Sequence, residues 1–264
     1  MTIGLIGAGN MATAIARGLA ANGFQAGQLA VYDIDAQKMA TLFEQTGARP
    51  CESAQDLIAC SDAVILAVKP QVFPMLLPTL STAFHRHEPL IISIAAGKTI
   101  ADIEGMVGGG LPIVRVMPNI NAKVGEALSA YCGNELVTDE GIALVVSILE
   151  AIGEAIAIDE KFFPLFSAMA GCSPAFHLLY IDAIARAGVR YGLPKDTSLK
   201  IASQAVLGTV RLLQETGEHP AVLIDQVCSP GGTTIEGVCA LKANQFEDTV
   251  MKAIKASLEK DLSL

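Results

Sequence analysis

Short apolar runs alternate with segments of helical periodicity from the start of the chain to about residue 158. The runs have strand length and are rich in Ile, Val and Leu; they cover residues 2–6, 29–32, 63–68, 90–95, 112–117 and 155–158. Continuous apolar strands separated by helices are typical of a parallel sheet that is covered on both faces. The pattern therefore predicts a doubly wound α/β domain with right-handed crossovers.

Beyond Lys161 the pattern changes to long helical stretches without a convincing strand. Turn-forming residues at 192–194, 218–220 and 229–232 separate these stretches. We therefore place a domain boundary near residue 160, with an α/β domain over 1–160 and an all-α domain over 161–264.

The predicted helices of the second half are apolar around most of their circumference. Residues 175–187, 199–213 and 221–227 leave few polar positions per turn. Such helices need packing partners on more than one side, and a small domain buries a limited share of its own surface. The pattern predicts a homodimer in which this area meets a second subunit. The alternative is that the area packs wholly on the first domain.

One stretch resembles a membrane span in composition, because residues 162–181 contain no Lys, Arg, Asp or Glu. Pro164, Gly171 and Pro174 interrupt it, and His177 adds a polar group. We expect a helix–break–helix that is buried on several sides, and no membrane partner.

Composition narrows the classes of function. The 264 residues are 52% hydrophobic and 17% charged, which is typical of a folded chain with a large core. The net charge of −9 repels phosphate backbones and Trp is absent, so nucleic acid is not an expected partner.

The six cysteines form no C-x-x-C pair and the four histidines lack ligand spacing, which predicts no metal site and a reducing, cytoplasmic compartment. No basic segment precedes the first apolar run, so a signal peptide is not indicated.

A glycine turn follows the first apolar run and opens a helical segment of small residues. It has the pattern G-x-G-x-x-A and comprises Gly7, Ala8, Gly9, Asn10, Met11 and Ala12. The first glycine permits a tight turn, the second lets the backbone approach a pyrophosphate, and the alanine allows the helix to pack closely on the strand. The anion would rest on the amides at the helix start. In this context the turn predicts a Rossmann-type dinucleotide-binding domain.

Asp33 follows the second run, where an acid can accept hydrogen bonds from an adenosine ribose. A carboxylate there repels a 2′-phosphate, so Asp33 favours NADH over NADPH. The nearest following cation is Lys38. The alternative is that Asp33 merely caps a helix that begins near Ala36.

Three further strands end in segments that the fold would direct toward the cofactor crevice, because ligands bind at the carboxyl ends of parallel strands. Lys69 is expected beside phosphate or nicotinamide ribose, with a solvated loop lysine as the alternative. The small residues that close the run at 90–95 would let a flat ring lie against the backbone. The segments comprise Ala67, Val68, Lys69 and Pro70; Ala95, Ala96 and Gly97; and Arg115, Val116, Met117, Pro118 and Asn119.

The second half carries one segment with several free amides and hydroxyl donors in one place. It comprises Ser229, Pro230, Gly231, Gly232, Thr233 and Thr234. A proline expected just inside a helix start, two glycines and two threonines are typical of a backbone nest for a carboxylate. If Ser229 were only a helix cap, the glycines would be unnecessary. A second break at 170–175 contains small residues, for which close helix crossing is the simpler explanation.

Taken in order, these motifs resemble those of the Δ1-pyrroline-5-carboxylate reductase family over residues 3 to about 245. The segment 229–234 is the most specific of them. The resemblance implies an all-α C-terminal domain that forms an intertwined dimer, with decamers in many members. It implies that NADPH or NADH is the cofactor, although members generally prefer NADPH.

The resemblance also implies roles for individual residues. Cofactor contacts are expected from Ile6, Gly7, Ala8, Gly9, Asn10, Met11, Ala67, Val68, Lys69, Pro70, Ala95, Ala96 and Gly97. Asp33 is added to them from its position after the second run, where many members carry Ser, Asn or Arg. Substrate contacts are expected from Met117, Pro118, Asn119, Ser229, Gly231, Gly232, Thr233 and Thr234. The substrate carboxylate would sit on the amides of 231–234, with the Thr234 hydroxyl near the ring nitrogen as the catalytic group. The chain departs from many members at Ile120 and Asn121, where they carry Thr and Pro, and at Ala170 and Cys172, where they carry Ser.

The activity implied is hydride transfer to the C=N carbon of 1-pyrroline-5-carboxylate, which gives L-proline. A protonated cyclic imine is already a strong electrophile, which suits a sequence without a His–carboxylate pair near the crevice. Two alternatives remain. A 3-hydroxyacid-type dehydrogenase would need a lysine on the first interdomain helix, and residues 171–182 contain none. A non-catalytic NAD(P)-binding redox sensor would have no use for the nest at 229–234.

Overall fold

The computed structural model describes residues 1–263. The chain divides into two compact units, Met1–Gly171 with the end of the chain from Asp261, and Cys172–Lys260. The domain boundary predicted near residue 160 lies eleven residues or so before this division, at a 3₁₀ turn, η4 (Glu160–Phe162).

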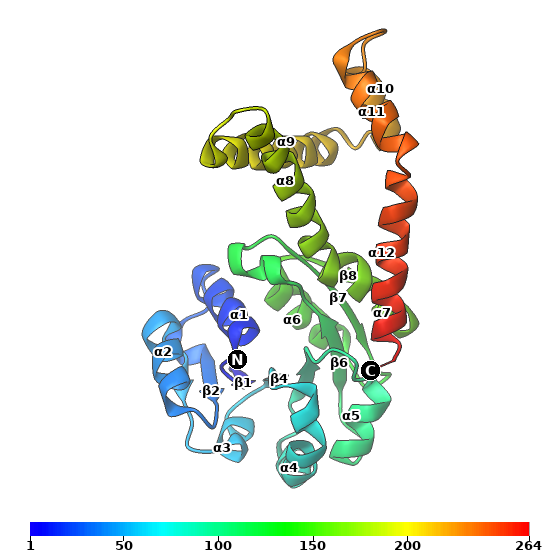
Figure 1. The fold of residues 1–264 in the computed structure, drawn as a ribbon. Helices are drawn as coiled ribbons and strands as arrows, with labels where there is room; N and C mark the ends of the chain where they lie inside the picture. Colours follow the sequence, from blue (N-terminus) through cyan, green and yellow to red (C-terminus); the bar gives the residue numbers. More distant parts are fainter. Residues whose placement is uncertain (264) are drawn as a thin grey trace. The chain divides into compact units, whose positions relative to one another are not determined.

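The first unit contains an eight-stranded sheet in the order β3-β2-β1-β4-β5-β6-β7-β8 within the described residues (Figure 1). The strands are β1 (Ile3–Ile6), β2 (Leu29–Tyr32), β3 (Arg49–Pro50), β4 (Ala63–Leu66), β5 (Leu90–Ser93), β6 (Ile113–Met117), β7 (Ala127–Gly133) and β8 (Gly153–Ala157). β1 to β6 pair in parallel, which confirms the doubly wound, Rossmann-type prediction. β7 was not predicted, and it runs antiparallel to β6 and parallel to β8.

Alternate residues of the central strands feed two separate cores. In β4, Ala63 and Ile65 face one core, whereas Val64 and Leu66 face the other. The first core is completed by α1 (Asn10–Ala21), α2 (Ala36–Thr46) and α6 (Asp139–Glu150). The second is completed by α3 (Ala54–Ala59), α4 (Phe73–His87) and α5 (Ile100–Val107). Both faces of the sheet are therefore covered, and its free carboxyl edge is where loops can form a site.

Short turns of 3₁₀ helix connect several of these elements. They are η1 (Ala26–Gln28), η2 (Pro70–Val72), η3 (Ile120–Val124) and η4. η2 and η3 directly follow β4 and β6 in the chain, so both lie at the carboxyl edge of the sheet.

The helical unit follows a run in which the helix type changes but the helix is not broken. α7 (Phe163–Phe166) continues into a π-helical stretch, η5 (Ser167–Cys172), and then into α8 (Ser173–Arg190). In place of the expected break there is a π-helical stretch, which ends just before Pro174, the second residue of α8. Proline has no N–H to donate, so the regular α-helical hydrogen bonds cannot continue through this point. Glu160–Arg190 is long and apolar enough to cross a membrane by length and composition alone, and 17% of its most apolar window is buried. The expected burial on several sides is therefore not met within one chain.

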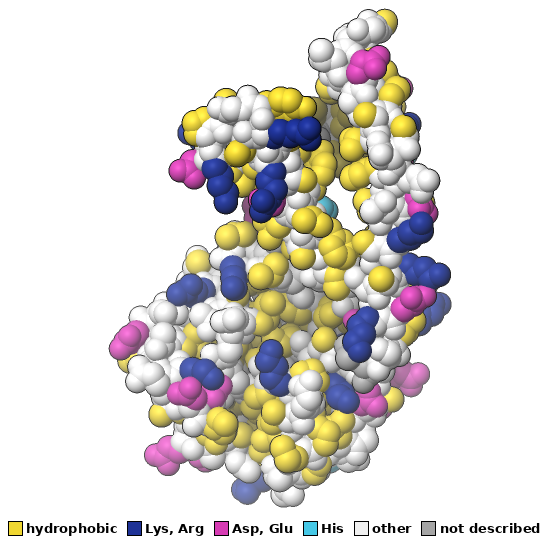
Figure 2. All heavy atoms as spheres, in the orientation of Figure 1, with side chains coloured by type: hydrophobic (Ala, Val, Ile, Leu, Met, Phe, Trp, Pro, Cys, Tyr) yellow, Lys and Arg dark blue, Asp and Glu magenta, His cyan; other side chains and the backbone are white. Residues whose placement is uncertain are grey.

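The remaining helices are α9 (Lys195–Thr216), α10 (Pro220–Val227), α11 (Thr233–Ala243) and α12 (Phe246–Asp261). α8 and α9 form a close hairpin in which Gly188 faces Ser198. Hydrophobic side chains remain exposed along these helices, as Figure 2 shows for one face of the molecule. Leu178 and Leu179 are 66% and 71% exposed, so the single chain leaves apolar area that a partner would cover.

Candidate functional site

The glycine turn joins β1 to α1 at the carboxyl edge of the sheet. Gly7 has a φ of +109°, and a Cβ on it would lie 2.8 Å from the carbonyl oxygen of Ala67, so a side chain does not fit. A Cβ at Gly9 would meet nothing within 4 Å. The two glycines therefore do different things: the first lets β1 and β4 end side by side, and the second leaves bare backbone facing open space.

The N-terminus of α1 is suited to an anion. Gly9 is the N-cap and provides no side-chain hydrogen bond, and the first turn carries no acidic residue. The first amides of the helix are thus left for a ligand or solvent, and the helix dipole favours negative charge there. Ala12 is fully buried against the sheet, as its place in the motif predicts.

Asp33 joins the glycine turn to the end of β2. Its Oδ2 accepts the amide of Ala8 at 2.7 Å, and its Oδ1 accepts the amide of Asp35 at 2.9 Å. α2 begins at Ala36 and its N-cap is Asp35, which accepts from Gln37 and Lys38. The alternative that Asp33 caps this helix is therefore wrong. Each carboxylate oxygen retains a lone pair that a ribose hydroxyl can use.

A cavity of about 850 Å³ lies along this edge of the sheet and is lined by the first unit alone. It brings together most of the residues predicted to bind the cofactor, namely Ile6, Gly7, Gly9, Asn10, Met11, Asp33, Ala67, Val68, Lys69, Pro70, Ala95 and Ala96. Pro118 and Asn119, predicted for the substrate, line it as well. Ala8, Gly97 and Met117 do not line it.

Sequence reasoning missed several lining residues. They are Ala14, Tyr32, Ile34, Val72, Leu76, Ile94, Ile120, Lys123 and Gly171, and Lys38, the cation that follows Asp33 in the sequence, lines the cavity as well. Ile34 is 94% exposed directly after Asp33, where an adenine ring would need an apolar surface. An isoleucine between two aspartates at the end of a strand was the available signal for it. Val72 and Leu76 lie one helical turn apart, which also could have marked a shared face.

Asn119 uses its whole side chain to hold the backbone around it. Its Nδ2 donates to the carbonyl of Ala170 at 3.0 Å, and its Oδ1 accepts the amide of Asn121 at 3.1 Å. Asn119 is 7% exposed, so these bonds are sheltered from water. The side chain thus ties the π-helical stretch to η3, and one N–H of Nδ2 and one lone pair of Oδ1 remain for a ligand.

Arg115 is a buried structural cation. Its Nη1 lies 3.1 Å from Oε1 of Glu160, and its guanidinium lies 4.5 Å from the ring centre of Phe163. The same Glu160 oxygen accepts the amide of Ile100 at 2.8 Å, at the start of α5. Burial, and then the negative charge of Glu160, raise the pKa of the neighbouring Cys132 thiol to about 11. The Arg115–Glu160 ion pair, through the bond of Glu160 to the amide of Ile100, therefore fixes the loop between β5 and α5, and part of this loop lines the cavity.

The segment at 229–234 forms a tight turn followed by a helix in the second unit. Gly232 N donates to Ser229 O at 3.0 Å, and Gly231 has a φ of +65°. Proline second and a left-handed glycine third are the residues that a type II turn requires. α11 begins only at Thr233, so Pro230 lies in the turn before the helix and not just inside the helix start as expected. The N-cap Gly232 provides no side-chain hydrogen bond, which leaves the amides of the first turn, including Thr233 and Thr234, for a ligand.

Within residues 1–263, no group of three or more His, Cys, Asp and Glu side chains lies close enough to hold a metal ion. The residues that could hold a cofactor are those of the cavity. Its bare helix start, the space above Gly9 and the apolar surface at Ile34 suit the pyrophosphate and adenine of a dinucleotide.

Comparison with known proteins places the chain. Residues 160–264 match the family model for pyrroline-5-carboxylate reductase dimerisation, and residues 2–97 match that for NADP oxidoreductase, coenzyme F420-dependent. The pyrroline-5-carboxylate reductase of Escherichia coli (strain K12) is 39% identical over 263 residues, which is 99% of this chain and 97% of the relative. This chain belongs to the pyrroline-5-carboxylate reductase family. The resemblance seen in the sequence motifs is thereby confirmed.

Solved members of the family share the fold over the whole length. A pyrroline-5-carboxylate reductase from Coxiella burnetii superposes with a TM-score of 0.95 at 31% identity, covering 99% of this chain and 97% of that one. The pyrroline carboxylate reductase of Plasmodium falciparum, solved with NADP bound, gives a TM-score of 0.88 at 31% identity, with the same coverage of both chains. The all-α prediction for the second half is confirmed, because this half matches the family's dimerisation domain and contains only helices among its described elements.

Proposed function

We propose that this protein reduces the C=N bond of 1-pyrroline-5-carboxylate with NADPH or NADH and releases L-proline. The observation that carries the proposal is the full-length relationship to pyrroline-5-carboxylate reductases, such as the Escherichia coli enzyme at 39% identity. The cavity supports it independently, since a glycine turn, an uncapped helix start and an aspartate at the end of β2 meet at one edge of the sheet.

The residues of the α/β unit would hold the cofactor, and the reaction itself needs little acid–base catalysis from the protein. When bound, the reduced nicotinamide supplies a hydride, and one proton from solvent completes the reduction of C=N to CH–NH. The imine nitrogen is basic enough to be protonated before the hydride arrives, so a strong general acid is not required. The protein's contribution is then mostly orientation.

The turn and helix start at 229–234 would bind the substrate carboxylate. The amides of Thr233 and Thr234 face no side-chain cap, and the turn fixes their direction. We propose that the carboxylate accepts hydrogen bonds from these amides and that the Thr234 hydroxyl donates to, or positions water at, the ring nitrogen. Thr234 is half-buried at the first turn of α11, which restricts the side-chain rotamers of its hydroxyl group.

The decisive experiment is a turnover assay with a defined panel. Oxidation of NADH and NADPH is followed with 1-pyrroline-5-carboxylate and then with a set of 3-oxo acids, and proline is identified as the product. Turnover of only the 3-oxo acids would assign a 3-hydroxyacid-type dehydrogenase instead. Coenzyme binding without turnover of either class would assign a redox sensor.

Thr234→Ala tests the proposed catalytic group. We expect kcat/KM for 1-pyrroline-5-carboxylate to fall by roughly ten- to a thousandfold, since orientation and one hydrogen bond in the transition state are lost. Thr249→Ala, on the exposed side of α12, is the matched control and is expected to retain full activity. Full activity of the Thr234 variant would remove this residue from the mechanism.

The location and higher assembly of the protein are also proposals. We propose a soluble, cytoplasmic enzyme without a membrane or nucleic-acid partner, whose dimers assemble further into decamers. The acidic net charge of −9 supports solubility, and the match to a dimerisation domain supports the dimer.

A further inference from the structure

η3 holds one lysine beside the N-terminus of α1. Asn119 caps η3 by accepting the amide of Asn121, and Gly125 closes its other end with a left-handed backbone. Ala122 is 5% exposed and packs in the same core as α1. The backbone that carries Lys123 is therefore fixed against α1, although the lysine side chain itself is exposed.

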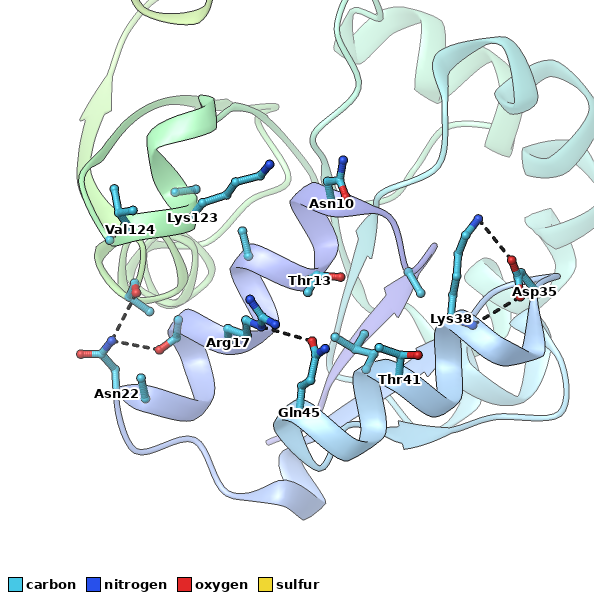
Figure 3. Close-up of a pocket in the computed structure, with 18 of the residues that line it drawn as sticks. Asn10, Thr13, Arg17, Asn22, Asp35, Lys38, Thr41, Gln45, Lys123 and Val124 are labelled. Carbon is cyan, nitrogen blue, oxygen red and sulfur yellow. Dashed lines mark hydrogen bonds and ion pairs between the residues drawn. The ribbon is translucent and has the colours of Figure 1, made fainter. Parts of the chain in front are cut away.

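Lys123 lies where two cavities of the first unit meet. Besides the 850 Å³ cavity, a second cavity of about 730 Å³ follows the outer side of α1 between α2 and η3. Asn10, Ala14, Lys38 and Lys123 line both. In the close-up of the second cavity, the Lys123 side chain extends from η3 toward Asn10, the first residue of α1 (Figure 3).

The charges near this helix start are not equivalent. Lys38 Nζ lies 3.5 Å from the carboxylate of Asp35, and the Nε of Arg17 donates to Gln45 at 3.2 Å. Among the described residues, Lys123 has neither an ion-pair partner nor a side-chain hydrogen bond. Lys69 and Lys123 are thus the lysines on the wall of the 850 Å³ cavity that form no ion pair within the described residues, and Lys123 is the one of the two that also lines the second cavity beside α1.

We infer that the Lys123 ammonium pairs with the pyrophosphate of the dinucleotide at the start of α1. This rests on the cofactor site of the proposed function and adds a residue to it. The amides of α1 approach the pyrophosphate from the helix axis, and a flexible lysine on η3 reaches the same anion from the side. Because the 2′-phosphate of NADPH is at the other end of the adenosine, Lys123 contributes equally to NADH and NADPH binding.

The test measures coenzyme binding without turnover, by the fluorescence of the reduced nicotinamide. In Lys123→Met we expect the Kd to rise about tenfold for both NADH and NADPH, as for a charge-assisted contact to a phosphate. Lys123→Arg should remain within about threefold of the wild type, because it keeps the charge. Lys161→Met, another exposed lysine with its own ion pair to Asp159, is the matched control and should leave both Kd values unchanged.

The pattern of Kd changes among the variants decides whether Lys123 binds the pyrophosphate. A tenfold loss for both coenzymes with rescue by arginine supports the inference. A loss confined to NADPH would place Lys123 at the 2′-phosphate, and no loss would show a solvated lysine; either result overturns it. A wild type that binds neither coenzyme would instead overturn the proposed function. Equal melting temperatures of the variants show that the fold is intact.

Discussion

At the scale of single residues, Asp33 lies where the sequence predicts, but the structure shows an additional role for it. The carboxylate was expected to meet a ribose, and it also holds the amides of Ala8 and Asp35. It therefore shapes the glycine turn before any ligand arrives. The position of Asp33 in the sequence predicted its place at the end of β2, but it did not predict these two bonds.

Asp33→Ser tests the preference between the two coenzymes. Removing the negative charge lowers the repulsion of a 2′-phosphate, so we expect the ratio of kcat/KM for NADPH to that for NADH to rise about tenfold. The measurement is a steady-state comparison of both coenzymes at saturating 1-pyrroline-5-carboxylate.

Asp33→Asn separates charge from hydrogen bonding in this experiment. Asparagine has one acceptor oxygen, so it keeps one of the two amide bonds while losing the charge. A similar rise in both variants would assign the effect to charge. An unchanged ratio in both would mean that Asp33 only supports the turn.

At the scale of elements, some helix starts are specified by residues that lie next to one another in the chain. α5 begins with a reciprocal cap in which Thr99 Oγ1 accepts the amide of Asp102 at 3.1 Å and Asp102 accepts the amide of Thr99 at 2.9 Å. These four consecutive positions contain the whole interaction, so neighbours in the chain suffice to specify it. β7 shows the opposite case. Its polar and small residues break the continuous apolar pattern of the other strands, and only pairing with β6 and β8 makes it a strand.

Thr99→Ala tests this helix start. We expect the free energy of unfolding of the α/β unit to fall by about 1 kcal/mol at pH 7, because the amide of Asp102 loses its acceptor. Thermal or urea unfolding followed by circular dichroism measures it. Thr79→Ala, an exposed threonine within α4, is the control and should change stability by less.

The same cap predicts a dependence on pH. Hydrogen bonds from the backbone and side chain of Thr99 hold the pKa of Asp102 below its usual value. A lowered pKa means that ionised Asp102 stabilises the folded state above about pH 4, and that this contribution is lost as the pH falls through the lowered pKa. Asp102→Asn should therefore be less stable than the wild type at pH 7, with the difference closing in acid. A difference that persists unchanged at low pH would mean that the charge is not involved.

At the scale of the whole molecule, the helical half is incomplete as a single chain. α11 and α12 contain no buried residue, and large apolar side chains of α8 and α9 are exposed. Residues 160–264 match a dimerisation domain, and a second copy of the chain would remove this apolar area from water. Dimer formation therefore explains why these side chains are exposed in the single chain.

Leu179→Asp tests this interpretation. A charge placed on an apolar contact of α8 costs more in the dimer than in the separated chain, so we expect a shift from dimers or decamers toward monomers in light scattering. Leu136→Asp, at a 51% exposed leucine of the first unit, is the control and should leave the mass unchanged. An unaltered assembly in the Leu179 variant would place the subunit contact elsewhere.

Four features could be predicted from the amino-acid sequence: the alternation of strands and helices, the glycine turn, the change to an all-helical half, and the family. These depend on residues close together in the chain, whose backbone preferences and apolar period act locally. Three contacts became visible only in the folded chain: Asp33 with the amide of Ala8, Asn119 with the carbonyl of Ala170, and Lys123 beside α1. Such contacts join residues far apart in the chain, and no local pattern encodes them. They arise when the two cores pack and bring the loops at one edge of the sheet together.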